Sequence, residues 1–307
     1  MSLYFAPAFF AHLLGKCLRR RNPAIEVTKL GAVVVATFAV VWAPFAVADG
    51  SGVDGILAVF TRLAPLQRGI YEDYVANFWC ATAPLARWKH RFGVSTLARF
   101  ALGATVLAAS PSMAHQIARP SREGFVWCMA NSAWAFFMFS FQVHEKSILL
   151  PLLPVTMLAL RAPSLSAWMQ PLACFSMWPL LQKDKLGVAY LGIILAHLAV
   201  LGGHPPAALN RVTVAGSNER PWRIVFSVTA IAIVVAHVAE MLVPPPPRLP
   251  YIHSLTFTSL GFVGFAGAAV YCNWRQWQIP TDEDAEGTGV AKPGSTEYRR
   301  RRKQHTD

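Results

Sequence analysis

Long apolar runs, separated by short polar and charged clusters, repeat along almost the whole chain. Many of these runs approach the length of about 20 residues that an α-helix needs to cross a bilayer core of roughly 30 Å. They are continuous rather than alternating, which argues against the strands of a membrane barrel. Since only helices and closed barrels satisfy every backbone N–H and C=O group in lipid, the pattern predicts an all-α, polytopic transmembrane helical bundle. About 9–10 membrane segments are predicted, at residues 2–15, 28–48, 74–86, 94–117, 124–143, 147–161, 164–182, 186–203, 222–243 and 251–272.

The pattern changes after residue 272. Residues 282–289 are acidic and glycine-containing, and a basic cluster follows at 299–303. Without apolar residues to bury, this part is expected to be disordered. The chain is therefore divided into a membrane region, 1–272, and a disordered tail, 273–307, which is expected to be cytosolic. The basic cluster also suits contact with anionic lipid, and the two interpretations are compatible.

Composition supports a membrane protein, since 54% of the residues are hydrophobic and only 14% are charged. The net charge of +12 comes from basic residues gathered in short loops, as in membrane proteins oriented by positive charge. No basic face is interleaved with stacking aromatic residues, which argues against a nucleic-acid partner. The five cysteines form no CxxC pair and suit small packing residues. Neither a metal nor a cofactor is predicted.

Counting membrane crossings from the two ends gives opposite sides for residues 144–146. With the basic tail and the loop 204–221 in the cytosol, this cluster lies on the lumenal side. With the basic stretch 16–21 in the cytosol and every segment crossing, it lies in the cytosol. One segment between 50 and 123 therefore does not cross. The segment 74–86 is short for a span and suits a re-entrant or interfacial element, so we favour the lumenal side.

The first candidate site is the cluster of His144, Glu145 and Lys146, which stands between the apolar runs 124–143 and 147–160. A central Asp, Lys or Arg costs roughly 2.5–3.5 kcal/mol on membrane insertion scales, so such a cluster marks either a membrane edge or a site. Histidine and lysine together suit a phosphate or pyrophosphate group, with the glutamate orienting one of them. The alternative is an ordinary juxtamembrane charge cluster whose side chains reach the interface.

The second candidate site lies in the stretch 68–80, which contains Arg68, Glu72 and Asp73. The two adjacent carboxylates suit a metal ligand pair or a base, or they stabilise the start of a helix through its dipole. A third charged stretch, 178–184, follows an aromatic segment end and suits an interfacial loop.

Three motifs give the chain a resemblance to a known family. They are FSFQVHEKSILLPLLP at 139–154, RGIYEDYVANFWC at 68–80 and WPLLQKD at 178–184. These resemble the dolichyl-phosphate-glucose-dependent glucosyltransferases of the endoplasmic reticulum, and the opening of the chain is similar to an internal helix of that family. The match extends from residue 1 to about 272.

The resemblance implies a multispan inverting glycosyltransferase of the C type in the membrane of the endoplasmic reticulum. Such enzymes transfer glucose from dolichyl-phosphate glucose to the oligomannose glycan on dolichyl pyrophosphate, in the lumen. The wording around His144 is closer to the enzyme that adds the first glucose, in α-1,3 linkage, than to the sibling that adds the second. With the charge pattern, the resemblance suggests that His144 and Lys146 contact the donor phosphate, with Glu145 beside them. Arg68, Glu72 and Asp73 would then shape the lumenal floor of the site.

One departure from the family pattern concerns the start of the chain. Family members carry further upstream helices and a first lumenal loop with an acidic residue proposed as the base. The expectation is therefore that this chain is the C-terminal portion of such an enzyme and is inactive by itself. Two other classes remain as alternatives. A transporter would need charges such as Arg99 or Glu240 along a path between broken helices. A non-catalytic membrane scaffold is the third.

Overall fold

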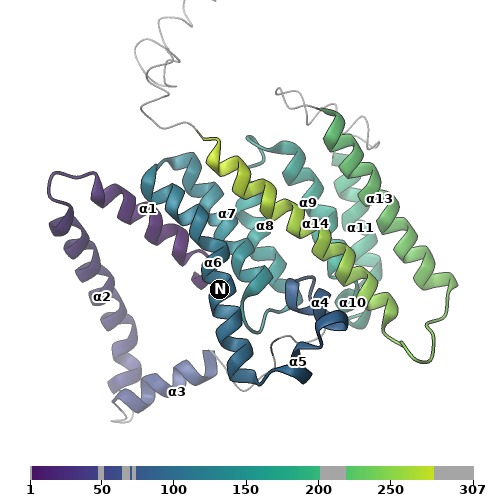
Figure 1. Cartoon of the computed structure of the whole chain (residues 1–307), viewed down its shortest axis with the longest axis horizontal. Coiled ribbons are helices and arrows are strands. Elements are labelled where there is room, and N and C mark those ends of the chain that lie inside the picture. Colours follow the sequence, from purple (N-terminus) through teal and green to yellow (C-terminus); the bar gives the residue numbers. More distant parts are fainter. Residues whose placement is uncertain (1, 48–51, 64–69, 71–73, 201–218, 280–307) are drawn as a thin grey trace, which may run out of the picture.

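The computed structural model describes residues 2–47, 52–63, 70, 74–200 and 219–279. No β-strand occurs among these residues and most of them are helical, so the predicted all-α fold is confirmed. Figure 1 shows a bundle in which most helices run antiparallel to their chain neighbours. In chain order the elements are η1 (Ser2–Tyr4), α1 (Ala6–Leu18), α2 (Pro23–Val47), α3 (Val53–Leu63), α4 (Phe78–Ala86), α5 (Trp88–Arg91), α6 (Val94–Ala118), α7 (Arg122–Phe139), η3 (Glu145–Ile148), α8 (Leu149–Met157), α9 (Pro163–Ser176), α10 (Trp178–Lys183), α11 (Gly187–Val200), α13 (Glu219–Leu242) and α14 (Ile252–Trp277).

Four of the described helices are long and apolar enough to cross a membrane, namely α2, α6, α13 and α14. Helices α1 and α11 are apolar but shorter. The chain is therefore a polytopic helical membrane protein. The other predicted segments are occupied by shorter elements. The range 164–182, for example, is divided into α9 and α10 at Met177, just before Pro179. The predicted total of nine or ten crossings stays a prediction.

The predicted segment 74–86 contains only the nine-residue helix α4. At about 1.5 Å per residue, such a helix covers less than half of a bilayer core of roughly 30 Å. Helices α4, α5 and α10 lie at the same end of the bundle as the connection 140–148 (Figure 1). We call this end, defined by these four elements, the site end. The position of α4 agrees with a segment that does not cross.

Helices α7 and α14 form the middle of the bundle and contact each other. Trp134 and Phe137 of α7 pack on Phe265 of α14, with ring centroids 5.5 and 5.7 Å apart. All three side chains are buried. Because lipid is as apolar as these side chains, close packing and interhelical hydrogen bonds hold such helices together.

A buried polar cluster joins α6, α7 and α14 at the opposite end of the bundle. The side-chain oxygen of Gln276 accepts hydrogen bonds from the Ser112 hydroxyl at 2.5 Å and from the Asn131 amide at 2.8 Å. Its nitrogen donates to the carbonyl oxygen of Ser112 at 2.9 Å. Gln276 is fully buried. In this position it forms part of the bundle.

The first residues of the predicted tail, 273–277, are helical, and the division of the chain into a membrane region and a tail stays a prediction. Helix α14 continues through Asn273 to Trp277, because Gln276 finds partners on two neighbouring helices and adds to the packing of the bundle. The rest of the predicted tail, from residue 280 on, lies outside the described residues.

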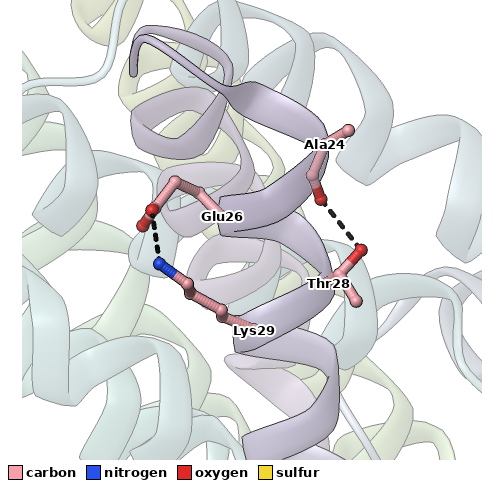
Figure 2. Close-up of polar contacts among 4 residues, drawn as sticks. All are labelled: Ala24, Glu26, Thr28 and Lys29. Carbon is pink, nitrogen blue, oxygen red and sulfur yellow. Dashed lines mark hydrogen bonds and ion pairs between the residues drawn. The ribbon is translucent and has the colours of Figure 1, made fainter.

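Helix α2 packs mainly on α1 and α3 and has no buried residue. Figure 2 shows how polar side chains at its start are satisfied within the helix. The Lys29 ammonium lies 3.2 Å from the Glu26 carboxylate, and the Thr28 hydroxyl donates to the carbonyl oxygen of Ala24 at 2.9 Å. Both interactions are exposed, so each contributes only a few tenths of a kcal/mol. The remaining helix is a continuous apolar surface that suits contact with lipid.

Candidate functional site

The cluster His144–Lys146 lies in the connection between α7 and α8, at the site end. Helix α7 ends when the Ser140 amide donates to the carbonyl oxygen of Phe136 at 2.9 Å. Gln142 then adopts a positive φ of 59°, a conformation that few residues other than glycine adopt. The following turn closes through a 2.9 Å hydrogen bond from the Ser147 amide to the His144 carbonyl oxygen. The reversal therefore places ionisable residues outside the regular helices.

The three ionisable side chains of this turn have different environments. Glu145 is buried, with only 4% of its side chain exposed, whereas His144 is 49% exposed and Lys146 is exposed as well. The His144 Nδ1 atom lies 2.9 Å from Glu145 Oε2. No donor among the described residues is aligned well enough with Oε2 to count as a hydrogen bond. We therefore treat the pair as an electrostatic contact. With Nδ1 directed to the carboxylate, Nε2 is the histidine nitrogen left to meet a ligand.

The second candidate segment passes beside this turn. The Gln142 amide donates to the carbonyl oxygen of Ile70 at 3.1 Å. The Trp79 indole donates to the carbonyl oxygen of Phe139 at 2.8 Å. Two contacts thus join residues about 60–70 positions apart in the sequence. The predicted residues Arg68, Glu72 and Asp73 themselves lie outside the described residues, so their role stays a prediction.

Asn77 fixes the start of α4 within this segment. Its Oδ1 atom accepts a hydrogen bond from the Cys80 amide at 3.0 Å, the usual arrangement of a helix N-cap. Asn77 is fully buried, and its Nδ2 atom has no partner among the described residues. Burial, with a smaller contribution from the Glu145 carboxylate, raises the pKa of the Cys80 thiol to about 11. Helix α4 therefore begins within electrostatic range of the His144–Glu145 pair.

Replacing Asn77 with Ala is expected to loosen the first turn of α4, because the capping oxygen is lost. Such a loss typically costs about 1 kcal/mol, which corresponds to roughly fivefold faster local opening. Hydrogen exchange at the Cys80 amide, followed by mass spectrometry, measures this opening. Asn77→Ser keeps a capping oxygen and should exchange nearly as slowly as the wild type. Equal exchange in the Ala and Ser variants would show that the cap contributes little.

Tyr4, from the start of the chain, also reaches this turn. Its hydroxyl is buried and forms hydrogen bonds with the Ser147 and Ser140 side chains. Its ring packs on Phe136, with centroids 5.1 Å apart, and its carbonyl oxygen accepts from the Ser132 hydroxyl at 2.6 Å. This contact could not be predicted locally, since nothing in residues 2–4 indicates a distant partner.

The third charged stretch, 178–184, forms α10 at the same end. The Trp178 indole donates to Glu240 Oε2 of α13 at 2.7 Å, and the Trp178 ring lies 4.9 Å from that of Tyr190. Glu240, one of the charges that a transporter would need along a path, is therefore hydrogen-bonded to α10. No group of three His, Cys, Asp or Glu side chains comes together for a metal ion in the described part of the chain.

The described part of the chain is a helical membrane bundle with a buried carboxylate, an exposed histidine and an exposed lysine in one terminal turn, and this turn is the candidate site. The chain belongs to the ALG6, ALG8 glycosyltransferase family, whose model matches residues 1–271. The resemblance seen in the sequence motifs is thus confirmed.

Individual relatives agree with this assignment. A protein of Arabidopsis thaliana named "Probable dolichyl pyrophosphate Man9GlcNAc2 alpha-1,3-glucosyltransferase" is 44% identical over 91% of this chain and 52% of its own length. Proteins of Saccharomyces cerevisiae and Gallus gallus named "Dolichyl pyrophosphate Man9GlcNAc2 alpha-1,3-glucosyltransferase" are 33% and 32% identical. The matches cover 92% and 89% of this chain, and 55% and 57% of those proteins. The chain spans about half the length of the curated relatives it matches.

Proposed function

We propose that this chain takes part in glucosylation of the dolichol-linked oligosaccharide and supplies the phosphate-binding part of the site. The donor would be dolichyl-phosphate glucose, the acceptor the oligomannose glycan on dolichyl pyrophosphate, and the new linkage α-1,3. The observation that carries this proposal is the His144–Glu145 pair, set in the turn between α7 and α8 of a glycosyltransferase family member. The relatives' names supply the acceptor and the linkage.

The chemistry of the transfer explains why cations belong in this turn. The acceptor hydroxyl oxygen bonds to the anomeric carbon of glucose while the bond from that carbon to the phosphate oxygen breaks. The departing dolichyl phosphate gains negative charge, and the hydroxyl proton passes to a base that we assign to no described residue. His144 Nε2 and the Lys146 ammonium would stabilise the phosphate as this charge develops. Glu145 would hold the imidazole so that Nε2 faces the ligand.

We propose that the site end faces the lumen of the endoplasmic reticulum. At the opposite end, the short connections carry arginines, including Arg19, Arg21, Arg119, Arg122 and Arg161. Short basic loops favour the cytosolic side. If the segment 74–86 is the one that does not cross and the other predicted segments do, counting from either end of the chain gives the same side for the turn 140–148. An impermeant label that reached Lys146 in sealed microsomes without permeabilisation would contradict this orientation.

Replacing His144 with Ala at the chromosomal locus tests the proposed function in the protein as the cell makes it. We expect unglucosylated lipid-linked oligosaccharide to accumulate and the initial transfer rate to fall at least about tenfold, because one charged contact with the phosphate is lost. Chromatography of the lipid-linked oligosaccharides measures the accumulation, and transfer of labelled glucose in microsomes measures the rate.

His253→Ala is the matched control, since His253 lies at the site end of α14 and its ring contacts the Val243 carbonyl oxygen at 2.8 Å, outside the turn. Accumulation of monoglucosylated oligosaccharide in the His144→Ala strain would assign the chain to the second glucose instead of the first. A normal oligosaccharide profile in that strain would overturn the proposed role of His144.

A further inference from the structure

Gly261 of α14 lies where two other parts of the chain meet this helix. An added Cβ atom at this position would lie 3.0 Å from the Cβ of Ala76 and 2.9 Å from the Cβ of Ser176. The distance to Ser176 is one that real Cβ atoms essentially never show, and the distance to Ala76 is tighter than nine in ten real Cβ contacts, so both neighbours would have to move. Ala76 and Ser176 are both buried. Glycine therefore allows the segment 75–77 and the end of α9 to approach α14 together.

The segment 75–77, which packs against α14 at Gly261, leads directly to the candidate site. Ala76 precedes Asn77, the N-cap of α4, and Trp79 of α4 donates to the Phe139 carbonyl oxygen at the end of α7. The turn with His144 and Glu145 begins directly after Phe139. The position of Ala76 against α14 is therefore linked to the turn that carries the ionisable pair. The link consists of the Asn77 cap and the Trp79–Phe139 hydrogen bond.

We propose that Gly261 is a positioning residue that sets how deeply the segment 75–77 seats against α14 and so holds α4 beside the His144–Glu145 pair. Helices α4 and α10 both contact α14 (Figure 1). The effect on glucose transfer rests on the proposed function. The effect on the position of α4 does not.

The same helix offers two matched controls. A Cβ atom at Gly264 would meet the side-chain end of Leu172 at 2.5 Å, so Gly264→Ala strains the contact between α14 and α9 without touching the segment 75–77. Nothing lies within 4 Å of a Cβ atom built at Gly267. Gly267→Ala therefore changes helix propensity alone.

Cys80 of α4 reports on the seating of this segment. It is 5% exposed, and burial raises the pKa of its thiol to about 11, so it should react slowly with a maleimide at neutral pH. Gly261→Ala is expected to increase its labelling rate about tenfold or more, because a displaced segment exposes the thiol to water and lowers its pKa toward the ordinary value. Mass spectrometry of membranes carrying the full chain separates Cys80 from the other cysteines. Gly264→Ala and Gly267→Ala should label like the wild type.

Rescue variants distinguish positioning from general helix packing. In Gly261→Ala, the additional change Ala76→Gly removes the contact with the segment, whereas Ser176→Gly removes the contact with α9. We expect Ala76→Gly to restore slow labelling of Cys80 and a wild-type KM for the donor. A loss of folded protein alone would change neither of these two quantities. Rescue by Ser176→Gly and not by Ala76→Gly would overturn the inference.

The activity measurements separate this inference from the proposed function. Unchanged Cys80 labelling and unchanged transfer in Gly261→Ala, with transfer still blocked in His144→Ala, would overturn the role of Gly261 alone. Increased Cys80 labelling in Gly261→Ala, with normal transfer in both variants, would support the placement of the segment and overturn the proposed function.

Discussion

Replacing Glu145 with Gln is expected to slow glucose transfer by roughly 10- to 100-fold while the protein still accumulates in the membrane. The substitution keeps the shape of a buried side chain but removes the negative charge that lies 2.9 Å from His144 Nδ1. Interactions with a charged partner are worth about 1.5–3 kcal/mol, and that range sets the expected loss. Initial rates with labelled donor in microsomes, corrected for protein level, provide the measurement.

A second carboxylate at the site end provides the control for this prediction. Glu240 belongs to α13 and accepts a hydrogen bond from the Trp178 indole, outside the turn 140–148, so Glu240→Gln should leave transfer near the wild-type rate. Glu145→Asp keeps the charge and should retain more activity than Glu145→Gln. Wild-type transfer by Glu145→Gln would mean that the carboxylate does not orient His144, and the site would then need another orienting group.

The long helices were predictable because hydropathy is a property of neighbouring residues. The predicted segment 94–117 matches α6 almost to the residue, and 251–272 lies within α14 except at its first position. The breaks within the predicted apolar segments were harder to predict. The apolar run 164–182 is interrupted at Met177, and 74–86 contains only a short helix. Apolar content shows that a segment suits lipid, but its bends depend on prolines and on contacts with distant helices.

Part of the candidate site was visible in the sequence because charge is rare between apolar runs. The different orientations of its three side chains were not visible in the sequence. Glu145 faces inward and its two neighbours face outward, and this depends on the turn geometry at Gln142. Tyr4 reaches the turn from the first residues of the chain. Asn77 carried a readable cap signal, a side-chain acceptor immediately before an apolar run, but its place beside the turn required tertiary contacts.

The same reasoning explains why the helical residues 273–277 were assigned to the tail. The stretch after residue 272 contains Asn273, Arg275, Gln276 and Gln278, which look like the start of a solvated tail. Two of these side chains turn inward. Gln276 enters the polar cluster, and the Arg275 guanidinium lies 5.9 Å from the Trp127 ring centroid. Single polar residues in a membrane bundle are stabilised by partners on other helices, which a reading of the local sequence does not supply.

Replacing Gln276 with Leu is therefore expected to destabilise the bundle by about 2 kcal/mol, even though leucine is the more apolar residue. The Ser112 hydroxyl and the Asn131 amide would both lose their acceptor in a buried environment, and each unsatisfied group costs about 1–3 kcal/mol, less what local rearrangement recovers. Thermal unfolding of the purified protein in lipid nanodiscs, followed by tryptophan fluorescence, measures the loss as a lower Tm. Gln278→Leu is the matched control, because Gln278 is exposed and accepts only a 3.4 Å contact from Arg275.

A triple variant tests the mechanism behind this loss. If the cost comes from donors left without acceptors, then removing those donors as well should recover most of the stability. Gln276→Leu combined with Ser112→Ala and Asn131→Leu removes both of these donors, and we expect its Tm to lie closer to the wild type than that of Gln276→Leu alone. A triple variant as unstable as the single one would instead assign the loss to the shape of the glutamine side chain. A stable Gln276→Leu would show that the cluster contributes little to joining α6, α7 and α14, and that packing of the aromatic core alone holds these helices together.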